Sequence, residues 1–110
     1  MPETVLHSLA DFAAAIGEER RVLLFKHSPI CPISAGALAE WKAFLSAAPA
    51  ATALFVDVVA DRSTARGIAE LCGVRHESPQ AILFAGGKPA WHASHEAITA
   101  ANLRQAWERP

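Results

Sequence analysis

A short run of continuously apolar residues constrains the fold of this chain more than any other feature. Residues 22–25, read Val-Leu-Leu-Phe, follow Arg21 and include no polar side chain. A strand with one face in solvent alternates apolar and polar residues, so this run predicts a strand that is covered on both faces. Such a strand lies at the centre of an α/β sheet, with helices packed on either side of it.

The rest of the sequence predicts alternating strands and helices that form one α/β domain over residues 1–110. Strand–helix–strand order favours parallel strands with right-handed crossovers, and the glycine pair 86–87 favours a hairpin at one edge of the sheet. We expect strands at 4–6, 21–25, 52–59, 80–85 and 90–93, and helices from Ser8 to Gly17, from Cys31 or Pro32 to Ala47, from Asp61 or Ser63 to Gly73, and from Thr99 to Glu108.

Local signals predict where the helices end and which sides they bury. Ser8 and Asp11 have the spacing of a capping box. Gly73 is typical of a helix end, and Thr99 is a suitable helix cap. Helical spacing predicts core positions at Leu9, Phe12, Ala13 and Ile16, at Ala35, Leu38, Trp41 and Leu45, at Ala65, Ile68, Leu71 and Cys72, and at Leu103, Ala106 and Trp107.

Composition excludes several classes of function. The net charge is -1, so nothing predicts a nucleic-acid or anionic-membrane partner. No apolar run approaches the roughly 18 residues that a membrane span needs, and Glu3, Asp11 and Glu18 interrupt any secretory signal. Two cysteines make no disulfide framework in a chain of 110 residues. We therefore expect a cytoplasmic, reducing setting, where an activated cysteine is more typical of catalysis than of structure.

Cys31 lies where the central strand is expected to turn into a helix. Pro32 fits the first helical position, because its missing N–H costs nothing there. A thiol at that point faces the free amides of the first turn and the positive end of the helix dipole, which favour the reactive thiolate. Lys26 and His27 are nearby bases, but neighbouring strand residues point to opposite faces, so only one is expected to approach the sulfur. We predict that Cys31 is a nucleophile; the alternative is a small buried hydrophobic residue.

Ser34 follows Cys31 by three residues and lies on the same face of the expected helix. In a two-thiol redox protein this place holds a second cysteine, which closes an internal disulfide, and a hydroxyl cannot do so. Ser34 can instead donate a hydrogen bond to the thiolate or satisfy backbone groups of the first turn. We therefore expect one-thiol exchange, in which Cys31 takes over half of a mixed disulfide and a second thiol removes that half.

The other cysteine, Cys72, is a candidate for an internal resolving thiol. It shares an apolar helix face with Ile68 near the end of the helix, which favours a structural role instead. A resolving role requires the Cα atom of Cys72 to come within about 7 Å of that of Cys31. The sequence leaves both roles open.

Ser78-Pro79 stands between a polar loop and an expected strand. The pair is either an ordinary turn or a cis peptide that lets the backbone of Ser78 pair with an extended substrate near the sulfur. His76, His92 and His95 follow no helical metal-binding spacing, and no cysteine pair accompanies them. We predict no metal site.

Taken together, these segments resemble the monothiol bacilliredoxins of the thioredoxin-like superfamily. The resemblance rests on residues 25–28 and 31–34, read Phe-Lys-His-Ser and Cys-Pro-Ile-Ser, on residues 76–80, and on residues 91–95 with 98–99. It spans about residue 3 to residue 107, and the pieces occur in order at suitable spacing. The resemblance implies a thioredoxin-like three-layer α/β/α fold, with a central mixed sheet flanked by four helices.

The resemblance also implies a reaction. Cys31 would attack mixed disulfides between protein cysteines and bacillithiol, a small sugar-linked thiol, take up the bacillithiol and free the protein thiol. No bound cofactor is implied; bacillithiol is the co-substrate and S-thiolated proteins are the partners. Positive charge from Lys26 and Arg75 would suit the malate group of this thiol, while Cys72 lies outside the family pattern. We expect Cys31, Pro32 and Ser34 to form the catalytic site, Lys26, His27, Ser78 and Pro79 to surround the substrate, and the Ser78–Pro79 peptide to be cis.

Two other classes of function stay open. One is iron–sulfur cluster binding, as in Cys-Gly-Phe-Ser glutaredoxins, although the ring of Pro32 crowds the place where a cluster would sit. The other is a thioredoxin-like adaptor that binds partners or small thiols without turnover. The adaptor hypothesis predicts that Cys31 is alkylated at the rate of an ordinary thiol.

Overall fold

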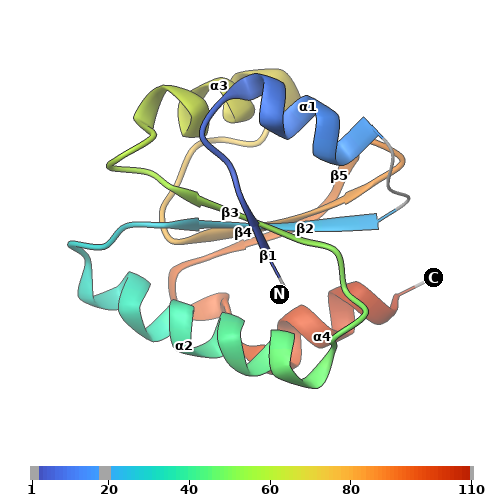
Figure 1. Cartoon of the computed structure of the whole chain (residues 1–110). Helices are drawn as coiled ribbons and strands as arrows, with labels where there is room; N and C mark the ends of the chain where they lie inside the picture. The colour runs from blue at the N-terminus through green and yellow to red at the C-terminus, as the bar shows by residue number, and fades with distance from the viewer. Residues whose placement is uncertain (1–2, 18–20, 110) are drawn as a thin grey trace.

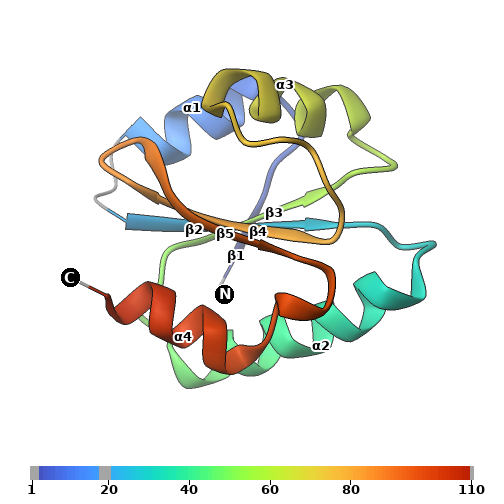
Figure 2. The same cartoon turned by 180° about the vertical axis from the view of Figure 1, so that it is seen from behind.

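The computed structural model of the chain describes residues 3–17 and 21–109, which fold into three layers. A mixed sheet forms the middle layer, α1 and α3 cover one face, and α2 and α4 cover the other (Figure 1; Figure 2 shows the reverse side). The elements are β1 (Glu3–Val5), α1 (Leu9–Gly17), β2 (Arg21–His27), α2 (Pro32–Ala47), β3 (Ala53–Asp57), α3 (Arg62–Cys72), β4 (Gln80–Ala85), β5 (Lys88–Ser94), the 3₁₀ turn η1 (His95–Ala97) and α4 (Ala100–Glu108).

The apolar run predicted to be central is β2, the middle strand in the order β1-β3-β2-β4-β5. β3 pairs with β2 in parallel, and β1 pairs with β3 in parallel. β4 pairs antiparallel to β2, and β5 antiparallel to β4. The predicted crossovers and edge hairpin are therefore present, and the three-layer α/β/α class is confirmed.

The two faces of β2 bury separate cores. Leu23 and Phe25 belong to the cluster beneath α2 and α4, where the Phe25 and Trp41 rings stack with centroids 5.2 Å apart. Val22 and Leu24 belong to the cluster beneath α1 and α3. Side chains of successive strand residues point to opposite faces, so a strand buried on both sides needs the continuous apolar run that the sequence shows.

The predicted helix signals act as expected. The Ser8 hydroxyl accepts a 3.0 Å hydrogen bond from the Asp11 amide, and the Asp11 carboxylate accepts one from the amide of His7. Gly73 ends α3 with a φ of 76°, a conformation that glycine adopts without strain. The Thr99 hydroxyl accepts a 3.1 Å hydrogen bond from the Asn102 amide and caps α4.

Several predicted core positions were wrong. Ala35 is exposed, because the row of α2 that faces the sheet starts from Ser34 rather than from its neighbour. Leu71 is 67% exposed, because the inward row of α3 runs through Thr64, Ala65 and Ile68. Two further predicted core residues, Leu9 and Ala13, are exposed on α1, and Trp107 is only partly buried.

Strand and helix bounds differ slightly from those predicted. β3 stops at Asp57, because the carboxylate of that residue accepts hydrogen bonds from the amides of Val59 and Ala60 and turns the chain. β5 is longer than predicted, and η1 falls where a loop was expected. Within the described ranges, no helix is long and apolar enough to cross a membrane.

Candidate active site

Cys31 is placed at the point where β2 gives way to α2. It is the N-cap residue of α2, Pro32 is the first helical residue, and the turn is closed by a 3.2 Å hydrogen bond from the Cys31 amide to the Ser28 carbonyl. The Cys31 side chain is half-buried and makes no capping hydrogen bond to the residues described. The first-turn amides of Ile33 and Ser34 have no acceptor within the helix, so a thiolate at this place would meet unpaired donors.

Ser34 is fully buried beneath this turn. Its hydroxyl oxygen accepts a 2.9 Å hydrogen bond from the Ser28 amide and lies 2.8 Å from Nδ1 of His27. The first contact ties the turn before Cys31 to the first turn of α2, which is one of the two roles expected for Ser34. The second contact is with a side chain that the sequence analysis did not connect to it.

His27 ends β2 on the face that α2 covers. Its ring lies 5.9 Å from that of Phe25 and 5.7 Å from that of Phe55, measured between centroids. Burial lowers the pKa of His27, Asp57 opposes this and Lys42 adds to it, so the imidazole is mostly neutral at pH 7. His27 is therefore the base on the side of the sheet where α2 carries Cys31.

Lys26 points to the other face, as strand alternation predicts. Its side chain has no exposed surface with which to contact a substrate. Nζ donates a 3.0 Å hydrogen bond to Oε1 of Gln80, and Nε2 of Gln80 donates one of 3.0 Å to the Arg75 carbonyl. Burial lowers the pKa of Lys26 to about 8, with smaller opposing contributions from Cys72 and Glu77 and a further lowering by Arg66.

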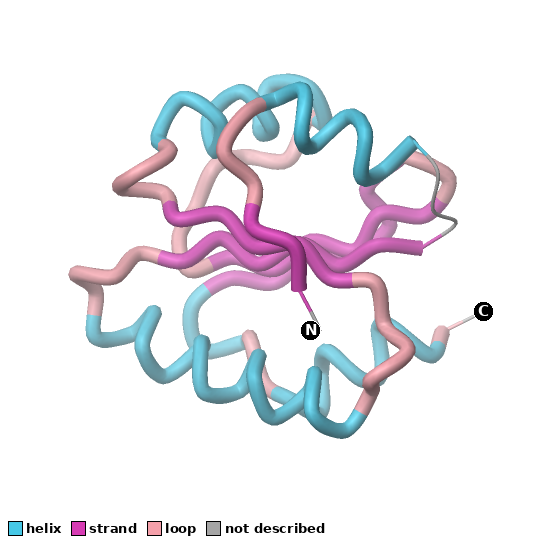
Figure 3. The backbone as a smooth tube through the Cα atoms, viewed as in Figure 1, coloured by secondary structure: helices cyan, strands magenta, loops and turns pink. Residues whose placement is uncertain are grey.

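The Ser78–Pro79 peptide is cis and stands at the same end of the sheet as Cys31, because β4 begins where β2 ends. The Pro79 carbonyl accepts a 3.1 Å hydrogen bond from the His95 amide. A hydrogen bond from Ser94 is the main cause that lowers the pKa of Glu77. The three segments of the sequence resemblance therefore gather at one end of the sheet, where Figure 3 shows the loops after β2 and β3 and the loop before β4.

Cys72 is the last residue of α3, on the face of the sheet opposite to α2 (Figure 1). It is half-buried and free, and it lines a hollow of about 230 Å³ with Phe12 and Phe84. The sheet separates Cys72 from Cys31, so the structure does not bring the two sulfurs together. The position of Cys72 favours a structural role over that of a resolving thiol.

Sequence reasoning missed several residues around the site. Gln80 is buried as the partner of Lys26, and only the pairing of β2 with β4 reveals it. Ile30 and Ile33, on either side of Cys31, are 82% and 43% exposed. The sequence signal that could have revealed them is the pair of large apolar residues on either side of a cysteine between a strand and a helix. Beside Ile33 lies a groove of about 290 Å³, whose other walls are Gly36, Ala37, Glu40, His95, Glu96, Ile98 and Thr99.

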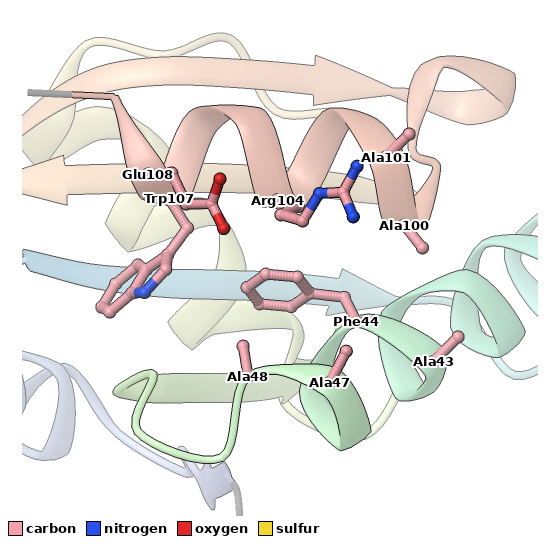
Figure 4. Close-up of a pocket in the computed structure, with 9 residues that line it drawn as sticks. All are labelled: Ala43, Phe44, Ala47, Ala48, Ala100, Ala101, Arg104, Trp107 and Glu108. Carbon is pink, nitrogen blue, oxygen red and sulfur yellow. The ribbon is translucent and has the colours of Figure 1, made fainter.

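A third hollow lies farther along α2, between its last turns and α4. It has a volume of about 190 Å³, and Phe44 and Trp107 project into the space between the two helices (Figure 4). Its walls include alanines 43, 47 and 48, with Arg104 and Glu108 at the α4 side. Cys31 caps the opposite end of α2, so this hollow is separate from the thiol site. Among the described residues, no group of three histidine, cysteine or acidic side chains is arranged to hold a metal ion.

Comparison with known proteins identifies the family. The sequence matches the family model described as monothiol bacilliredoxin BrxC over residues 4–103. The chain belongs to the monothiol bacilliredoxin family. A solved structure described as a candidate oxidoreductase with a thioredoxin fold is 34% identical to this bacilliredoxin, with a TM-score of 0.90, and the match covers 97% of this chain and 95% of that chain.

More distant structures agree on the fold of this bacilliredoxin. Thioredoxin from Fasciola hepatica is 20% identical, with a TM-score of 0.76 and 96% of each chain covered. Oxidised mitochondrial thioredoxin 3 from Saccharomyces cerevisiae is 17% identical, with a TM-score of 0.74, covering 94% of this chain and 91% of that chain. The thioredoxin fold is confirmed, and the family supports a thiol oxidoreductase.

Proposed function

We propose that this bacilliredoxin removes bacillithiol from protein mixed disulfides by one-thiol exchange at Cys31. The observation that carries the proposal is the half-buried Cys31 at the N-cap of α2, with the hydroxyl of Ser34 at the position where a two-thiol protein has its second cysteine. The free amides of the first turn favour its thiolate. An internal disulfide within this site is not available, so an external thiol must complete the cycle.

The reaction is a pair of thiol–disulfide exchanges. The Cys31 thiolate attacks the bacillithiol sulfur, a Cys31–bacillithiol disulfide forms, and the protein–bacillithiol disulfide breaks. The protein thiolate leaves and takes up a proton from water. A second bacillithiol, as thiolate, then attacks the bound bacillithiol sulfur, which releases bacillithiol disulfide and restores the Cys31 thiolate. Cys31 is a free thiolate again at the end of the cycle, so the bacilliredoxin is not oxidised overall. The proposed setting is a reducing cytoplasm.

The surface around Cys31 suits protein substrates. Ile30 and Ile33 flank the sulfur and offer apolar contacts to an approaching chain. The backbone of Ser78 before cis Pro79 is at the same end of the sheet, where an extended segment of substrate can pair with it. We assign Ser78 and Pro79 to substrate binding, and we assign Lys26 to support of their loop through Gln80.

The test is mass spectrometry of the protein after exposure to a bacillithiol mixed disulfide. We expect one bacillithiol adduct on Cys31, which excess free bacillithiol removes. Cys31→Ser should lose the adduct and all turnover, and the matched variant Cys72→Ser should turn over like the wild type. A Cys31–Cys72 disulfide in place of the adduct would contradict the one-thiol mechanism. An unmodified Cys31 would favour the adaptor hypothesis instead.

A further inference from the structure

The groove beside Ile33 follows one side of α2 away from the thiol. Its α2 wall is a single helix face, with residues at the i, i+3, i+4 and i+7 positions: Ile33, Gly36, Ala37 and Glu40. The facing wall comes from η1 and the residues that lead into α4, and η1 and α4 both pack against α2 (Figure 2). The groove therefore begins at the residue that flanks Cys31 and runs along the helix that Cys31 caps.

The lining of the groove is apolar at its floor and acidic at its walls. Ala37 and Ile98 are buried and form the floor, whereas Glu40 is half-buried and Glu96 is exposed. Among the described residues that line the groove, none is a lysine or an arginine. A protonated His95 would offset only one of the two carboxylates, so the groove stays negative.

The Glu40 carboxylate is held in place at the α2 wall. Its Oε1 accepts a 2.7 Å hydrogen bond from the amide of Ala100, at the start of α4. The structure gives this carboxylate no other hydrogen bond from a described residue, so its second oxygen is available to a ligand. A cation in the groove meets an acceptor that is already ordered, which reduces the entropy lost on binding.

An apolar floor between carboxylates matches a lysine or arginine side chain. Such side chains lay their aliphatic stems along apolar surface and keep the charged end at a polar group. Bacillithiol matches the groove poorly, because the carboxylates of its malate group are repelled by the two glutamates. The charge of the groove therefore favours the protein half of a mixed disulfide over the bacillithiol half.

We propose that this groove binds the protein half of the mixed disulfide and selects substrates with a lysine or arginine about four residues from the modified cysteine. The proposal rests on the exchange at Cys31 proposed above, and it makes Glu40 and Glu96 specificity-determining residues. At a rise of about 1.5 Å per residue, Glu40 lies about 13 Å along α2 from Cys31. An extended substrate chain covers that distance in about four residues.

The test compares single-cysteine peptides that differ only at this position, where they carry lysine, glutamine or glutamate. The variable residue precedes the cysteine in one set of peptides and follows it in the other. Each peptide is prepared as a mixed disulfide with bacillithiol and, as a reference, with the uncharged thiol 2-mercaptoethanol. The readout is the second-order rate constant for exchange with Cys31 in a Cys72→Ser background, which leaves one thiol.

In one of the two sets, the lysine peptide should react about fivefold faster than the glutamine peptide, and the glutamate peptide should be the slowest. Added salt should reduce these differences. Glu40→Gln keeps an oxygen for the Ala100 amide and should lower the lysine preference, and the pair Glu40→Gln and Glu96→Gln should abolish it. The matched control is Glu70→Gln on α3, across the sheet, which should keep the wild-type preference.

Equal rates for the three peptides in the wild type would overturn the proposal. A loss of preference in Glu70→Gln as large as that in Glu40→Gln would also overturn it, because net charge would then be the cause. Failure of the proposed function gives a different result. Lysine preference in the 2-mercaptoethanol series without any exchange in the bacillithiol series would overturn bacillithiol removal and support this inference.

A second measurement locates the bound peptide in the wild-type groove. The disulfide between Cys31 and each peptide is trapped in the Cys72→Ser background, and backbone amide signals are compared by NMR. The signals of Gly36 and Ile98 should differ between the lysine and glutamate adducts, since only the lysine side chain should occupy the groove. Identical signals in the two adducts would overturn the proposal.

Discussion

Lys26 and His27 are adjacent in the chain, and they show how differently the two faces of one sheet use a basic side chain. Lys26 faces α1 and α3, is fully buried and binds Gln80. His27 faces α2, stacks with aromatic rings and binds Ser34. Lys26 therefore supports the loop that carries Pro79, whereas His27 contacts the helix that follows Cys31.

The difference teaches that closeness in sequence does not place a residue in a site. Both residues were expected around the substrate, although strand alternation predicted that only one of them would approach the sulfur. A one-residue step along a strand reverses the face, so only His27 shares a layer with α2. Stability should therefore depend more on Lys26, and reactivity more on His27.

The largest expected effect is on the free energy of unfolding, and it separates the structural role of Lys26 from the role of His27 near the thiol. Lys26→Ala should lower the free energy of unfolding by about 2–4 kcal/mol, because it leaves a cavity and an unpaired Gln80 Oε1. His27→Ala should cost about 1 kcal/mol, since that side chain is half-buried. Urea unfolding measures both. The alkylation rate of Cys31, measured where both variants are folded, should change in His27→Ala and stay near wild type in Lys26→Ala; the reverse pattern would contradict the comparison.

The pH dependence of stability gives an intermediate effect. The pKa of Lys26 is about 8 in the folded chain and that of an unfolded lysine is 10.5, so the unfolded chain binds more protons between these values. The unfolding free energy of the wild type should rise with pH across this window relative to Lys26→Met. We expect a gain of about 1–2 kcal/mol. Parallel pH profiles for the two proteins would show that burial does not hinder protonation of Lys26.

The smallest expected effect concerns the helix caps on the two faces. The Thr99 side chain caps α4, whereas Asp61, the N-cap of α3, makes no side-chain capping bond to the described residues. Thr99→Ala should cost about 1 kcal/mol. Asp61→Ala should cost about 0.5 kcal/mol or less, because its 3.0 Å contact is with the exposed side chain of His7. A larger loss in Asp61→Ala would contradict this ranking.

The sequence predicted the parts of the fold that depend on local chemistry. The apolar run before Lys26 predicted the central strand, Gly73 and Thr99 predicted helix ends, and the glycine pair at 86–87 predicted the hairpin. Cys31 and Pro32 predicted the start of α2. Each of these depends on a few neighbouring residues.

The misplaced or missing features depend on contacts between elements that local sequence signals do not show. Ser34 was not expected to shift the buried row of α2, because its burial relies on contacts with the Ser28 amide and the His27 ring, which precede the helix. Gln80 pairs with Lys26 across 54 positions of sequence. The φ of 57° at His95, which leads into η1, is uncommon for any residue other than glycine, so the residue type did not predict it.

The strand order has a consequence for how the molecule avoids aggregation. The two edges of the sheet are β1 and β5, whose free backbone groups are where a strand from another molecule would add. β1 is only three residues long. β5 begins with Lys88 and Pro89, and its pairing with β4 shifts register between Leu83 and Phe84. Edge-to-edge pairing is discouraged by a short edge strand, a charged residue, a proline and an irregular ladder. Two copies of this protein therefore have few exposed backbone groups through which their sheets could join.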